Sequence, residues 1–416
     1  WKEINMNIRK FIFLPVVLNL FDGNTNVTTD VGLSGEMKKF YDKTLIKLAE
    51  PALIHDQFGQ KKPIPQGSGK TIEFRKYDSL PKQLTPLTEG VTPNGQKLTM
   101  TTLEATVSQY GGFIELSDML KLTAIDNNQV EALELIAGQA GRTLDTITRE
   151  ELNGGTNVIY GGGKAARHLL VGGDATEANN DYLVVDLVKK AVRFLKVQNA
   201  QKISGDFVAI IHPDNTYDFT NDADWKQPHI YVDTANMYSG EIGKVGGCRF
   251  VENTEAKIFH GADLASNSRT LLANGAVTAG TSVNFDGGTV AAGALVGRYV
   301  IVNGTKAKVT ANTATVMTLD TAVTCADNAV IYPGEAGAEG RDVYSTLVLG
   351  SNAYGVSEIS GGGLQYIVKQ LGSAGTADPL DQRATVGWKA TKAVKRLVEQ
   401  YMVRIETTST FQTGAN

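Results

Sequence analysis

Cysteine and histidine are scarce in this sequence, and their positions match no common disulfide or metal pattern. The two cysteines among the 416 residues, Cys248 and Cys325, lie far apart, so neither a disulfide framework nor a zinc site with paired cysteines is predicted. The five histidines lack close ligand spacing and stand at positions 55, 168, 212, 229 and 260. We therefore expect no bound metal.

The chain also lacks a basic excess and a long apolar run. Its formal net charge is −4 and its pI is near 5.8, whereas a general nucleic-acid binder usually carries surplus Lys and Arg. The apolar run at residues 11–21 (FIFLPVVLNLF) is interrupted by Pro15 and Asn19 and is shorter than the about 20 apolar residues that a bilayer span needs. No membrane partner is expected. Apolar residues make up 42% of the chain, enough for two or three domains.

The same run follows Lys10, and a basic residue before an apolar run is typical of a signal peptide. Residues 22–25 (DGNT) do not form a small-residue cleavage site, so a sticky N-terminal arm is the favoured interpretation and secretion is the alternative. The first residue is Trp1, and translation from Met6 would leave the first five residues outside the native protein.

One long amphipathic helix is predicted over residues 126–155. Apolar or small residues recur there every three or four positions, at Val130, Leu133, Ile136, Ala137, Ala140, Leu144 and Ile147. Asp126 can cap the start, and Gly154 and Gly155 favour a stop. At 1.5 Å per residue the helix would be about 40 Å long. Its other face carries Glu, Arg, Asp and Thr, so we expect that face to meet water or another subunit.

Proline is uncommon but concentrated, because residues 61–96 hold five of the eleven prolines. The flanking residues 70–77 and 97–109 alternate as strands but lack a strong apolar face. Two such strands joined by a Pro-rich tip predict an extended hairpin that leaves the body of the molecule. A hairpin of this kind is marginal alone in water, so we expect it to rest on a neighbour.

Shorter patterns predict the remaining elements. Helices are predicted over residues 36–58, where Pro51 should break or kink the helix, and over residues 186–197. Strands are predicted at residues 207–211, 248–252, 342–349 and 364–371. The C-terminal residues 384–409 are predicted to form a hairpin of long strands.

Residues 270–335 differ in composition, since charges are few and Ala, Gly, Val and Thr dominate. Short strands are predicted there at residues 289–291, 299–302, 307–309, 316–319 and 329–332. The pair Asn303-Gly304 indicates a hairpin turn. This segment is predicted to be a small β insertion, either a barrel or a sandwich.

Three patterns resemble sites of catalysis or nucleotide binding. Residues 67–71 (GSGKT) match the end of a P-loop, but the full motif needs Gly where Ile64 stands, and a strand follows instead of a helix. His212 beside Asp214 resembles a general base with its orienting carboxylate, but a strand end capped by Asp214 explains the pair better. Residues 361–363 (GGG) indicate a turn. No catalytic, cofactor-binding or metal-binding residue is predicted.

Interface anchors are harder to separate from core residues. Trp388 and Arg142 belong to types enriched in binding hot spots, yet Trp388 filling the core and Arg142 as a solvated helix charge are equally good interpretations. The full set of candidate assembly-interface residues is Phe13, Phe74, Arg75, Lys82, Glu89, Arg142, Arg149 and Trp388.

The order of these parts resembles the major capsid protein of tailed bacteriophages, with the Hong Kong 97-like fold, and is similar to a podophage-type coat protein family. The segments that carry the resemblance cover most of the chain except residues 1–35 and the β insertion. They are YDKTLIKLAEPALIHDQFG (41–59), LTPLTEGVTPNG (84–95), GGFIELSDMLKLTAIDNN (111–128), AGRTLDTITREELNGGTNVIY (140–160), VAIIHPD (208–214), GEIGKVGGCRFVE (240–252) and GWKATKAVKRLVEQYMVRIETTSTF (387–411).

This resemblance implies an α+β chain with an N-terminal arm, an extended β-hairpin loop, a long spine helix, an axial α/β domain and a small all-β insertion. The implied domains are the arm and first helix (1–60), the hairpin loop (61–115), the peripheral domain (116–184 and 381–416), the axial domain (185–269 and 336–380) and the insertion (270–335). Covalent cross-linking occurs in some relatives, but no motif around Lys70, Lys82 or Lys97 establishes it here.

The implied function is that of a structural protein, not an enzyme, that self-assembles into the icosahedral head shell of a double-stranded DNA phage. The implied partners are further copies of the chain in pentameric and hexameric capsomers, a separate scaffolding protein, a portal and a possible decoration protein. Weak, non-specific contact with packaged DNA is also implied. The protein would assemble in the host cytoplasm and reside in the virion. The alternatives are a secreted β-rich surface protein and, less favoured, an NTP-binding enzyme that uses residues 67–71.

Overall fold

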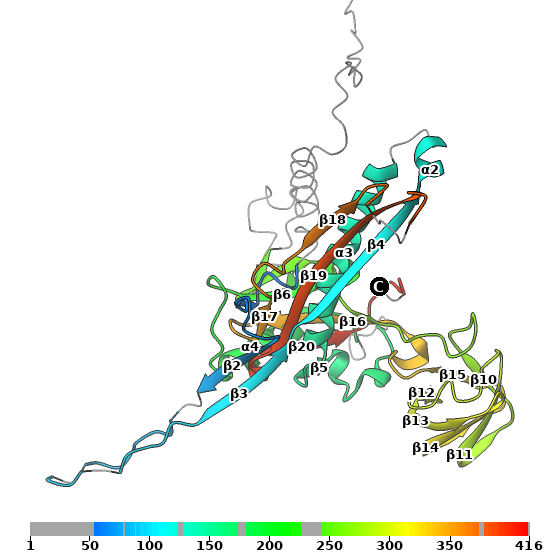
Figure 1. Cartoon of the computed structure of the whole chain (residues 1–416). Helices are drawn as coiled ribbons and strands as arrows, with labels where there is room; N and C mark the ends of the chain where they lie inside the picture. The colour runs from blue at the N-terminus through cyan, green and yellow to red at the C-terminus, as the bar shows by residue number, and fades with distance from the viewer. Residues whose placement is uncertain are drawn as a thin grey trace, which may run out of the picture.

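The computed structural model describes residues 54–77, 80–87, 89–92, 94–123, 128–173, 180–225, 243–373 and 378–414 (Figure 1). The N-terminal run with Phe13, and most of the helix predicted over residues 36–58, lie outside this part. The end of that predicted helix is wrong, because residues 55–58 form a turn. Hydrogen bonds between this turn and the side chains of Asp145 and Thr148, described below, hold the turn in place.

A long ribbon of two strands crosses the molecule with a long helix beside it (Figure 1). Helix α3 (Asn128–Asn153) confirms the predicted helix and ends where two glycines follow. Strands β4 (Ser108–Ser117) and β19 (Arg383–Arg396) pair antiparallel over ten residues. The apolar face of α3 packs on this ribbon through Leu133, Ile136, Ala137, Ala140 and Leu144 against Val386, Trp388 and Ala390.

Strand β4 continues directly from the hairpin. Strand β3 (Met100–Thr106) pairs with β2 (Thr71–Tyr77), and the single residue Val107 separates β3 from β4. Val107 is buried and its amide donates to the Lys70 carbonyl over 2.8 Å, which fixes the change of direction. The strand predicted over residues 97–109 is confirmed for Met100–Thr106, but the buried Val107 ends it, and residues 108–109 belong to a strand of another sheet.

Strand β19 is the centre of a five-stranded sheet. Its strands follow the order β1 (Gln60–Lys61), β17 (Tyr354–Ser357), β19 and β18 (Gln365–Lys369). Strand β4 also pairs with β19, along the edge opposite to β18. The short helix α2 (Asp118–Thr123) follows β4. In this arrangement the five-stranded sheet forms one layer, and helix α3 packs on it as the second layer. The sheet joins a strand that continues from the hairpin to a strand from the C-terminal part of the chain.

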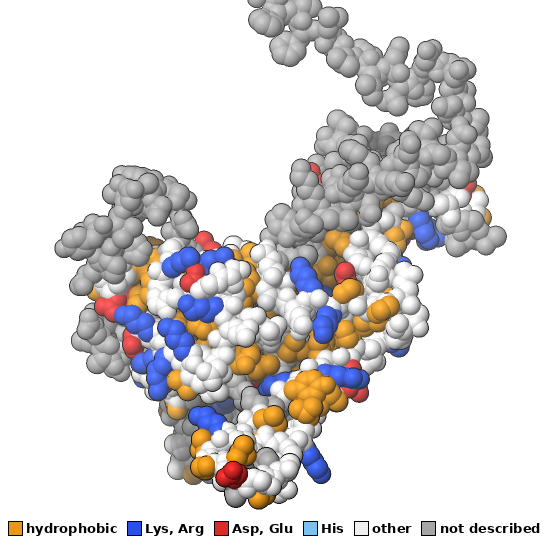
Figure 2. Space-filling view, turned by 90° about the vertical axis from the view of Figure 1, so that its left-hand side faces the viewer, with side chains coloured by type: hydrophobic (Ala, Val, Ile, Leu, Met, Phe, Trp, Pro, Cys, Tyr) orange, Lys and Arg blue, Asp and Glu red, His pale blue; other side chains and the backbone are white. Residues whose placement is uncertain are grey.

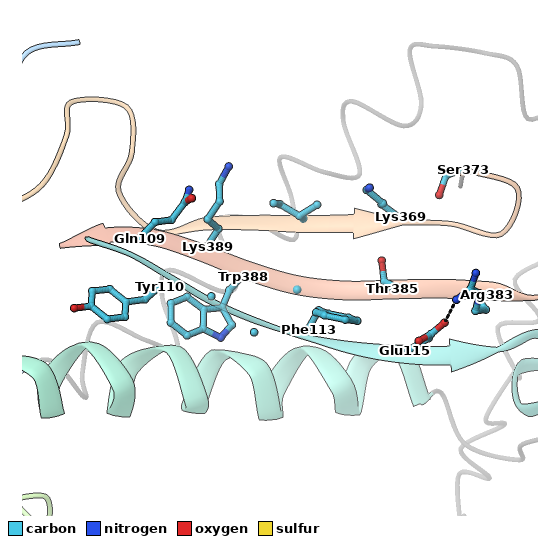
Figure 3. A pocket seen from close by; sticks show the side chains of 14 residues that line it. Gln109, Tyr110, Phe113, Glu115, Lys369, Ser373, Arg383, Thr385, Trp388 and Lys389 are labelled. Atoms are coloured by element: carbon cyan, nitrogen blue, oxygen red, sulfur yellow. Dashed lines mark ion pairs between the residues drawn. The ribbon is translucent and has the colours of Figure 1, made fainter. Parts of the chain in front are cut away.

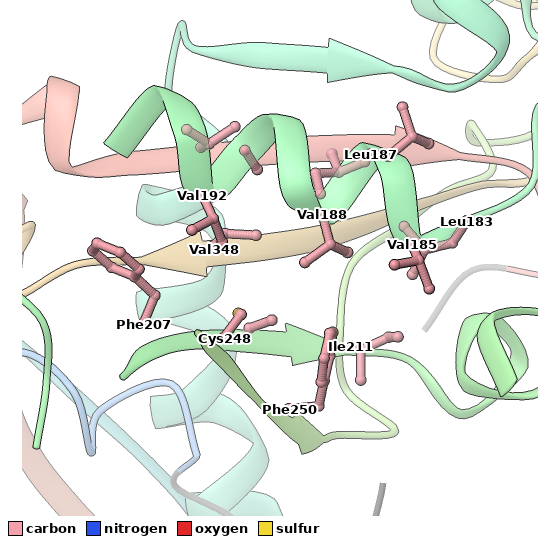
Figure 4. Close-up of a cluster of buried hydrophobic side chains, with 14 of the residues drawn as sticks. Leu183, Val185, Leu187, Val188, Val192, Phe207, Ile211, Cys248, Phe250 and Val348 are labelled. Carbon is pink, nitrogen blue, oxygen red and sulfur yellow. The ribbon is translucent and has the colours of Figure 1, made fainter. Parts of the chain in front are cut away.

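A second sheet of seven strands forms the main core. Its order is β5 (Val158–Tyr160), β20 (Met402–Thr407), β16 (Val343–Leu349), β6 (Phe207–Ile211), β8 (Cys248–Glu252) and β7 (Lys244–Val245), with β9 (Ile258–Phe259) on β16. Helix α4 (Val185–Val197) covers one face with Leu187, Val188, Val192 and their neighbours (Figure 4). The predictions for α4, β6, β8 and β16 are confirmed. Helix α5 (Pro213–Asn221) follows β6.

The predicted C-terminal hairpin is wrong, because β19 and β20 do not pair with each other. The 3-10 turn Glu399–Tyr401 lies between them, and β20 enters the seven-stranded sheet between β5 and β16. All six residues of β20 are buried. An interior strand needs a partner on each edge, so β20 satisfies its backbone groups better there than at the edge of a hairpin.

The β insertion is a closed barrel with its own apolar core. The strands are β10 (Leu271–Ala273), β11 (Val277–Asp286), β12 (Tyr299–Val302), β13 (Thr305–Asn312), β14 (Val316–Cys325) and β15 (Val330–Pro333), in the order β10-β11-β14-β13-β12-β15. The Asn303-Gly304 turn is confirmed between β12 and β13, and both residues have positive φ. Residues 289–291 are not a strand, and β11 was missed because its register shifts around Gly280 disturb the alternation.

None of the described helices is both long and apolar enough to cross a membrane.

Candidate assembly surfaces

The hairpin β2–β3 projects far from the body of the molecule (Figure 1). Its strands pair from Thr71–Thr106 to Tyr77–Met100, and the chain beyond this last pair carries large exposed apolar side chains. Leu84 and Leu87 are 84% and 76% exposed, and Tyr77, Leu80, Val91 and Leu98 are also more than half exposed. A stretch of this kind is costly to leave in water, so it fits a surface that another subunit covers.

The base of the hairpin is held by the molecule's own core. Phe74 of β2 is buried together with Ile64, Ala105, Val107 and Ala393. Because β19 supplies Ala393, the hairpin root is fixed against the long ribbon while its outer part extends away. The predicted interface residue Phe74 therefore lies in the core of its own chain.

A buried ion pair ties the segment before the hairpin to the ribbon and to α3. The Lys392 ammonium donates to both carboxylate oxygens of Asp56, over 2.8 and 2.6 Å, and to the Leu144 carbonyl over 2.6 Å. Thr148 also donates to Asp56. Burial lowers the pKa of Lys392, and Asp56 opposes that shift. We call Asp56, Thr148 and Lys392 the hairpin anchor.

A second buried group lies beside the anchor. His55 Nδ1 is 2.6 Å from Asp145 Oδ2, and the His55 amide donates to Asp145 Oδ1 over 2.8 Å. The Asn253 side chain donates to Asp145 over 3.2 Å, and Tyr354 donates to the His55 carbonyl. Residues from three other segments thus fix this turn, and both His55 and Asp145 are fully buried.

The face of the five-stranded sheet turned away from α3 contains a groove of about 690 Å³ (Figure 3). We call it the sheet groove. In the strand register Gly387 of β19 lies between Ile367 of β18 and Phe113 of β4. Because Gly387 has no side chain, the groove is deepest between these two apolar residues. Phe113 is 71% exposed. Positive side chains surround this apolar strip, namely Lys369, Lys389 and Arg383, and Arg383 is 3.3 Å from Glu115.

Trp388 lies on the opposite side of the same sheet, facing α3 (Figure 3). Its indole Nε1 donates to Gln139 Oε1 over 3.1 Å, and the residue is 4% exposed. Gly112 makes this approach possible, because a Cβ there would lie 2.7 Å from Gln139 Oε1. Of the two interpretations left open, the structure shows that Trp388 fills the core.

The other predicted interface residues divide into exposed and buried ones. Arg75 has 60% of its side chain exposed and forms an ion pair with its strand neighbour Glu73, at 3.2 Å. Arg149 is 3% exposed, donates to the Glu255 carbonyl over 2.8 Å and contacts Glu150 at 3.0 Å. The remaining exposed candidates are Lys82, Glu89 and Arg142.

Phe113 and the anchor residues were absent from the sequence-based candidates. Alternation in residues 108–117 (SQYGGFIELS) would have indicated a strand, and it leaves Phe113 and Glu115 on one face. No local signal marks Lys392, because its burial depends on Asp56, 336 residues away.

The patterns considered for chemistry take ordinary structural roles among the described residues. Gly67 and Gly69, both with positive φ, form a turn that leads into strand β2. His212 is the N-cap of α5 and accepts from the Asp214 amide over 3.2 Å, so the predicted capping by Asp214 is wrong. The Asp214 carboxylate instead accepts from Tyr344 over 2.7 Å. No group of three or more His, Cys, Asp or Glu in the described part could hold a metal.

Comparison with known families gives a match to a capsid family. A family model described as phage capsid protein matches residues 115–318, from strand β4 through most of the barrel. A comparison with curated protein sequences gives no match.

Comparison with solved structures gives many matches, and those described here are phage capsids. The capsid of cyanophage P-SCSP1u is 12% identical, with a TM-score of 0.50, over 86% of this chain and 89% of that chain. The capsid of Ralstonia phage GP4 is 14% identical, with a TM-score of 0.51, over 87% and 90%. The head of Helicobacter pylori bacteriophage KHP40 is 11% identical, with a TM-score of 0.50, over 84% and 87%. At these identities the likeness concerns the fold.

Proposed function

We propose that this chain is a major capsid protein, a subunit of the phage head shell, and that its copies assemble through the projecting hairpin and the sheet groove. The family match supports the capsid function, and the shared fold agrees with it. In the proposed shell, pentameric and hexameric capsomers form an icosahedral head around double-stranded DNA.

The observation that carries this proposal is that two large surfaces are left uncovered in the single chain. The outer hairpin exposes apolar side chains such as Leu84 and Leu87, and the sheet groove exposes Phe113. Each surface is unfavourable in water and each becomes favourable once a neighbouring copy covers it. We propose that the hairpin of one subunit lies in the sheet groove of the next.

Of the charged candidates on the hairpin, Glu89 is opposite in sign to the lysines that border the groove, whereas Lys82 and Arg75 carry the same sign as those lysines. Lys82 and Glu89 lie on the outer hairpin and Arg75 lies near its root, while Lys369 and Lys389 border the groove. Rim charges of this kind set register and choice of partner more than they set affinity. Arg142, exposed on α3, and Phe13 of the N-terminal arm are proposed to contact further copies.

We propose the domain division that the resemblance implies. Helix α3 and strands β19, β5 and β20 would belong to the peripheral domain, the other strands of the seven-stranded sheet with α4 would belong to the axial domain, and the barrel would be the insertion. The close pairing of β10 with β15 supports a self-contained insertion, since its two ends are neighbours in one sheet. A separate scaffolding protein, a portal and a decoration protein are proposed partners, and assembly is proposed to occur in the host cytoplasm.

The proposal is tested by imaging the purified protein by negative-stain electron microscopy beside light scattering, with and without the neighbouring phage gene products. Closed shells, or rings of five and six subunits, are the expected result. Only monomers or small dimers in both preparations would contradict it.

Phe113→Ser should weaken assembly without unfolding the subunit. The side chain is 71% exposed, so the free energy of unfolding should change by about 0.5 kcal/mol or less. If a neighbour covers Phe113, losing the buried ring should raise the protein concentration needed for assembly by roughly tenfold per 1.4 kcal/mol of lost contact. Light scattering over a concentration series measures this. The exposed Leu122→Ser on α2 is the matched control, and an equal effect from it would contradict the role of the groove.

A further inference from the structure

Five cations from three segments converge on the outer face of α4. Lys189, Arg193 and Lys196 follow each other at the spacing of one helical face and are exposed. Lys202 from the loop after α4 and Lys244 of β7 are also exposed beside them. We call these five residues the α4 patch. The patch is unexpected in a chain whose net charge is −4.

Acidic neighbours compensate this charge only in part. Lys189 is 3.1 Å from Asp224, and Lys244 is 2.6 Å from Asp206. Among the described residues, the other three cations of the patch have no carboxylate within ion-pair distance. The Lys244 ammonium, with Lys202 and Arg249 nearby, holds the pKa of the Asp206 carboxyl below its usual value. Exposed ion pairs contribute little, and a stronger anion can replace them.

The patch contains a shallow hollow of about 460 Å³ beside a glycine turn. Lys189, Arg193 and Lys196 line it together with Gly246. Gly246 and Gly247 have positive φ, which favours residues without a Cβ, and they leave the turn open next to the cations. A Cβ on Gly247 would lie 3.6 Å from Lys202 Nζ. A small hollow bordered by flexible cations suits a phosphate group.

The charged ends of the side chains around the hollow favour nucleic acid over protein as the partner, although the wall of the hollow also includes Val192 and Val197. Protein interfaces bury an apolar centre, as the sheet groove with Phe113 could, whereas protein–DNA interfaces are polar and strongly positive. Within the patch and its hollow, among described residues, Val197 is the one large exposed apolar side chain. No aromatic residue lines the hollow, so stacking on single-stranded bases is not favoured. Lys and Arg also gather on the face shown in Figure 2.

We propose that the α4 patch binds the phosphate backbone of double-stranded DNA without sequence preference, and that this face of α4 lines the inside of the shell. The proposal rests on the proposed capsid function, and it adds which surface meets the genome and how the subunit is oriented. Contacts of this kind are electrostatic, so binding should weaken steeply with salt.

Binding is measured by fluorescence anisotropy of a labelled DNA duplex with the soluble full-length subunit. Three to five phosphate contacts would give a slope of log affinity against log salt of roughly −3 to −5. Arg193→Glu/Lys196→Glu should reduce that slope by about 2 and weaken binding at least tenfold at low salt. The matched control, Lys62→Glu/Lys308→Glu, changes the net charge equally at exposed positions elsewhere.

Three results would overturn the DNA proposal. The first is no binding by the wild-type protein at about 50 mM salt, where such contacts are strong. The second is equal weakening by the patch variant and its control. The third is that poly-glutamate of equal charge competes as well as the duplex, which would indicate an acidic protein as the partner.

Orientation is measured with a Lys196→Cys variant and a polyethylene-glycol maleimide too large to enter a closed shell. Both native cysteines are buried, and burial raises the pKa of Cys248 to about 12, so the background is low. The introduced thiol should react in free subunits and not in closed shells; reaction in both would place this face outside. Absence of shells would count against the capsid proposal, while the binding experiment on soluble subunits still decides the patch.

Discussion

Replacing residues 78–99 by an Asn-Gly turn should abolish shell formation and leave a folded subunit. Tyr77 and Met100 are paired at the outer end of β2 and β3, so a two-residue turn can join them directly. The core contacts of Phe74 and Ala105 remain, and a shorter loop costs less closure entropy, so the melting temperature should stay equal or rise. Electron microscopy and sedimentation should show soluble protein with no closed shells.

A full-length variant separates the chemistry of the hairpin from its length. Leu84→Ser/Leu87→Ser keeps the reach of the hairpin but removes two side chains that are 84% and 76% exposed. We expect assembly only at raised protein concentration, whereas Gln83→Ser/Thr85→Ser, which alters neighbouring polar residues, should assemble normally. Normal shells from the shortened hairpin would refute the proposed contact between neighbouring subunits.

The second large effect is expected at the hairpin anchor. Lys392→Met should reduce the free energy of unfolding by about 3–5 kcal/mol, because it leaves the Asp56 carboxylate without its cation in a largely buried place. The Leu144 carbonyl would also lose a donor. Urea unfolding of the soluble subunit measures the change, and assembly should fail at temperatures where wild-type subunits still form shells.

The double variant Asp56→Asn/Lys392→Met tests whether the pair is the cause. The double variant should lose less free energy of unfolding than the sum of the losses of the two single variants. The reason is that each single variant leaves one buried charge without its partner, whereas the double variant leaves none. Lys395→Met on the same strand is the control, and it should change stability by about 0.5 kcal/mol. Additive losses, or an equal loss from Lys395→Met, would show that the ion pair is not what holds this segment.

Local patterns were sufficient for elements whose stability is largely decided within one segment. The three-and-four spacing of apolar residues predicted α3, and the following glycines predicted its end. The Pro-rich segment between two strands without an apolar face predicted the hairpin, and the charge-poor stretch predicted a separate β unit that is a barrel. The combination of these parts was enough to indicate the capsid family.

Pairing and burial were decided only in the tertiary structure. Strand β20 appeared to be the return strand of a C-terminal hairpin, but its place is between β5 and β16 in another sheet. Trp388 was equally consistent with core and interface until Gln139 of α3 proved to be its partner. Alternation along a strand defines two faces, and it does not tell which face another element covers.

The sequence by itself therefore determined the kinds of element, their order and the segments that lack an apolar partner of their own. The folded chain determined which surfaces stay uncovered and which charges are buried. Lys392 and Lys389 look alike in the sequence, yet one pairs with Asp56 in the interior and the other borders the sheet groove. The physical reason is that desolvation of a charge depends on atoms brought close from hundreds of residues away, and no local pattern encodes them.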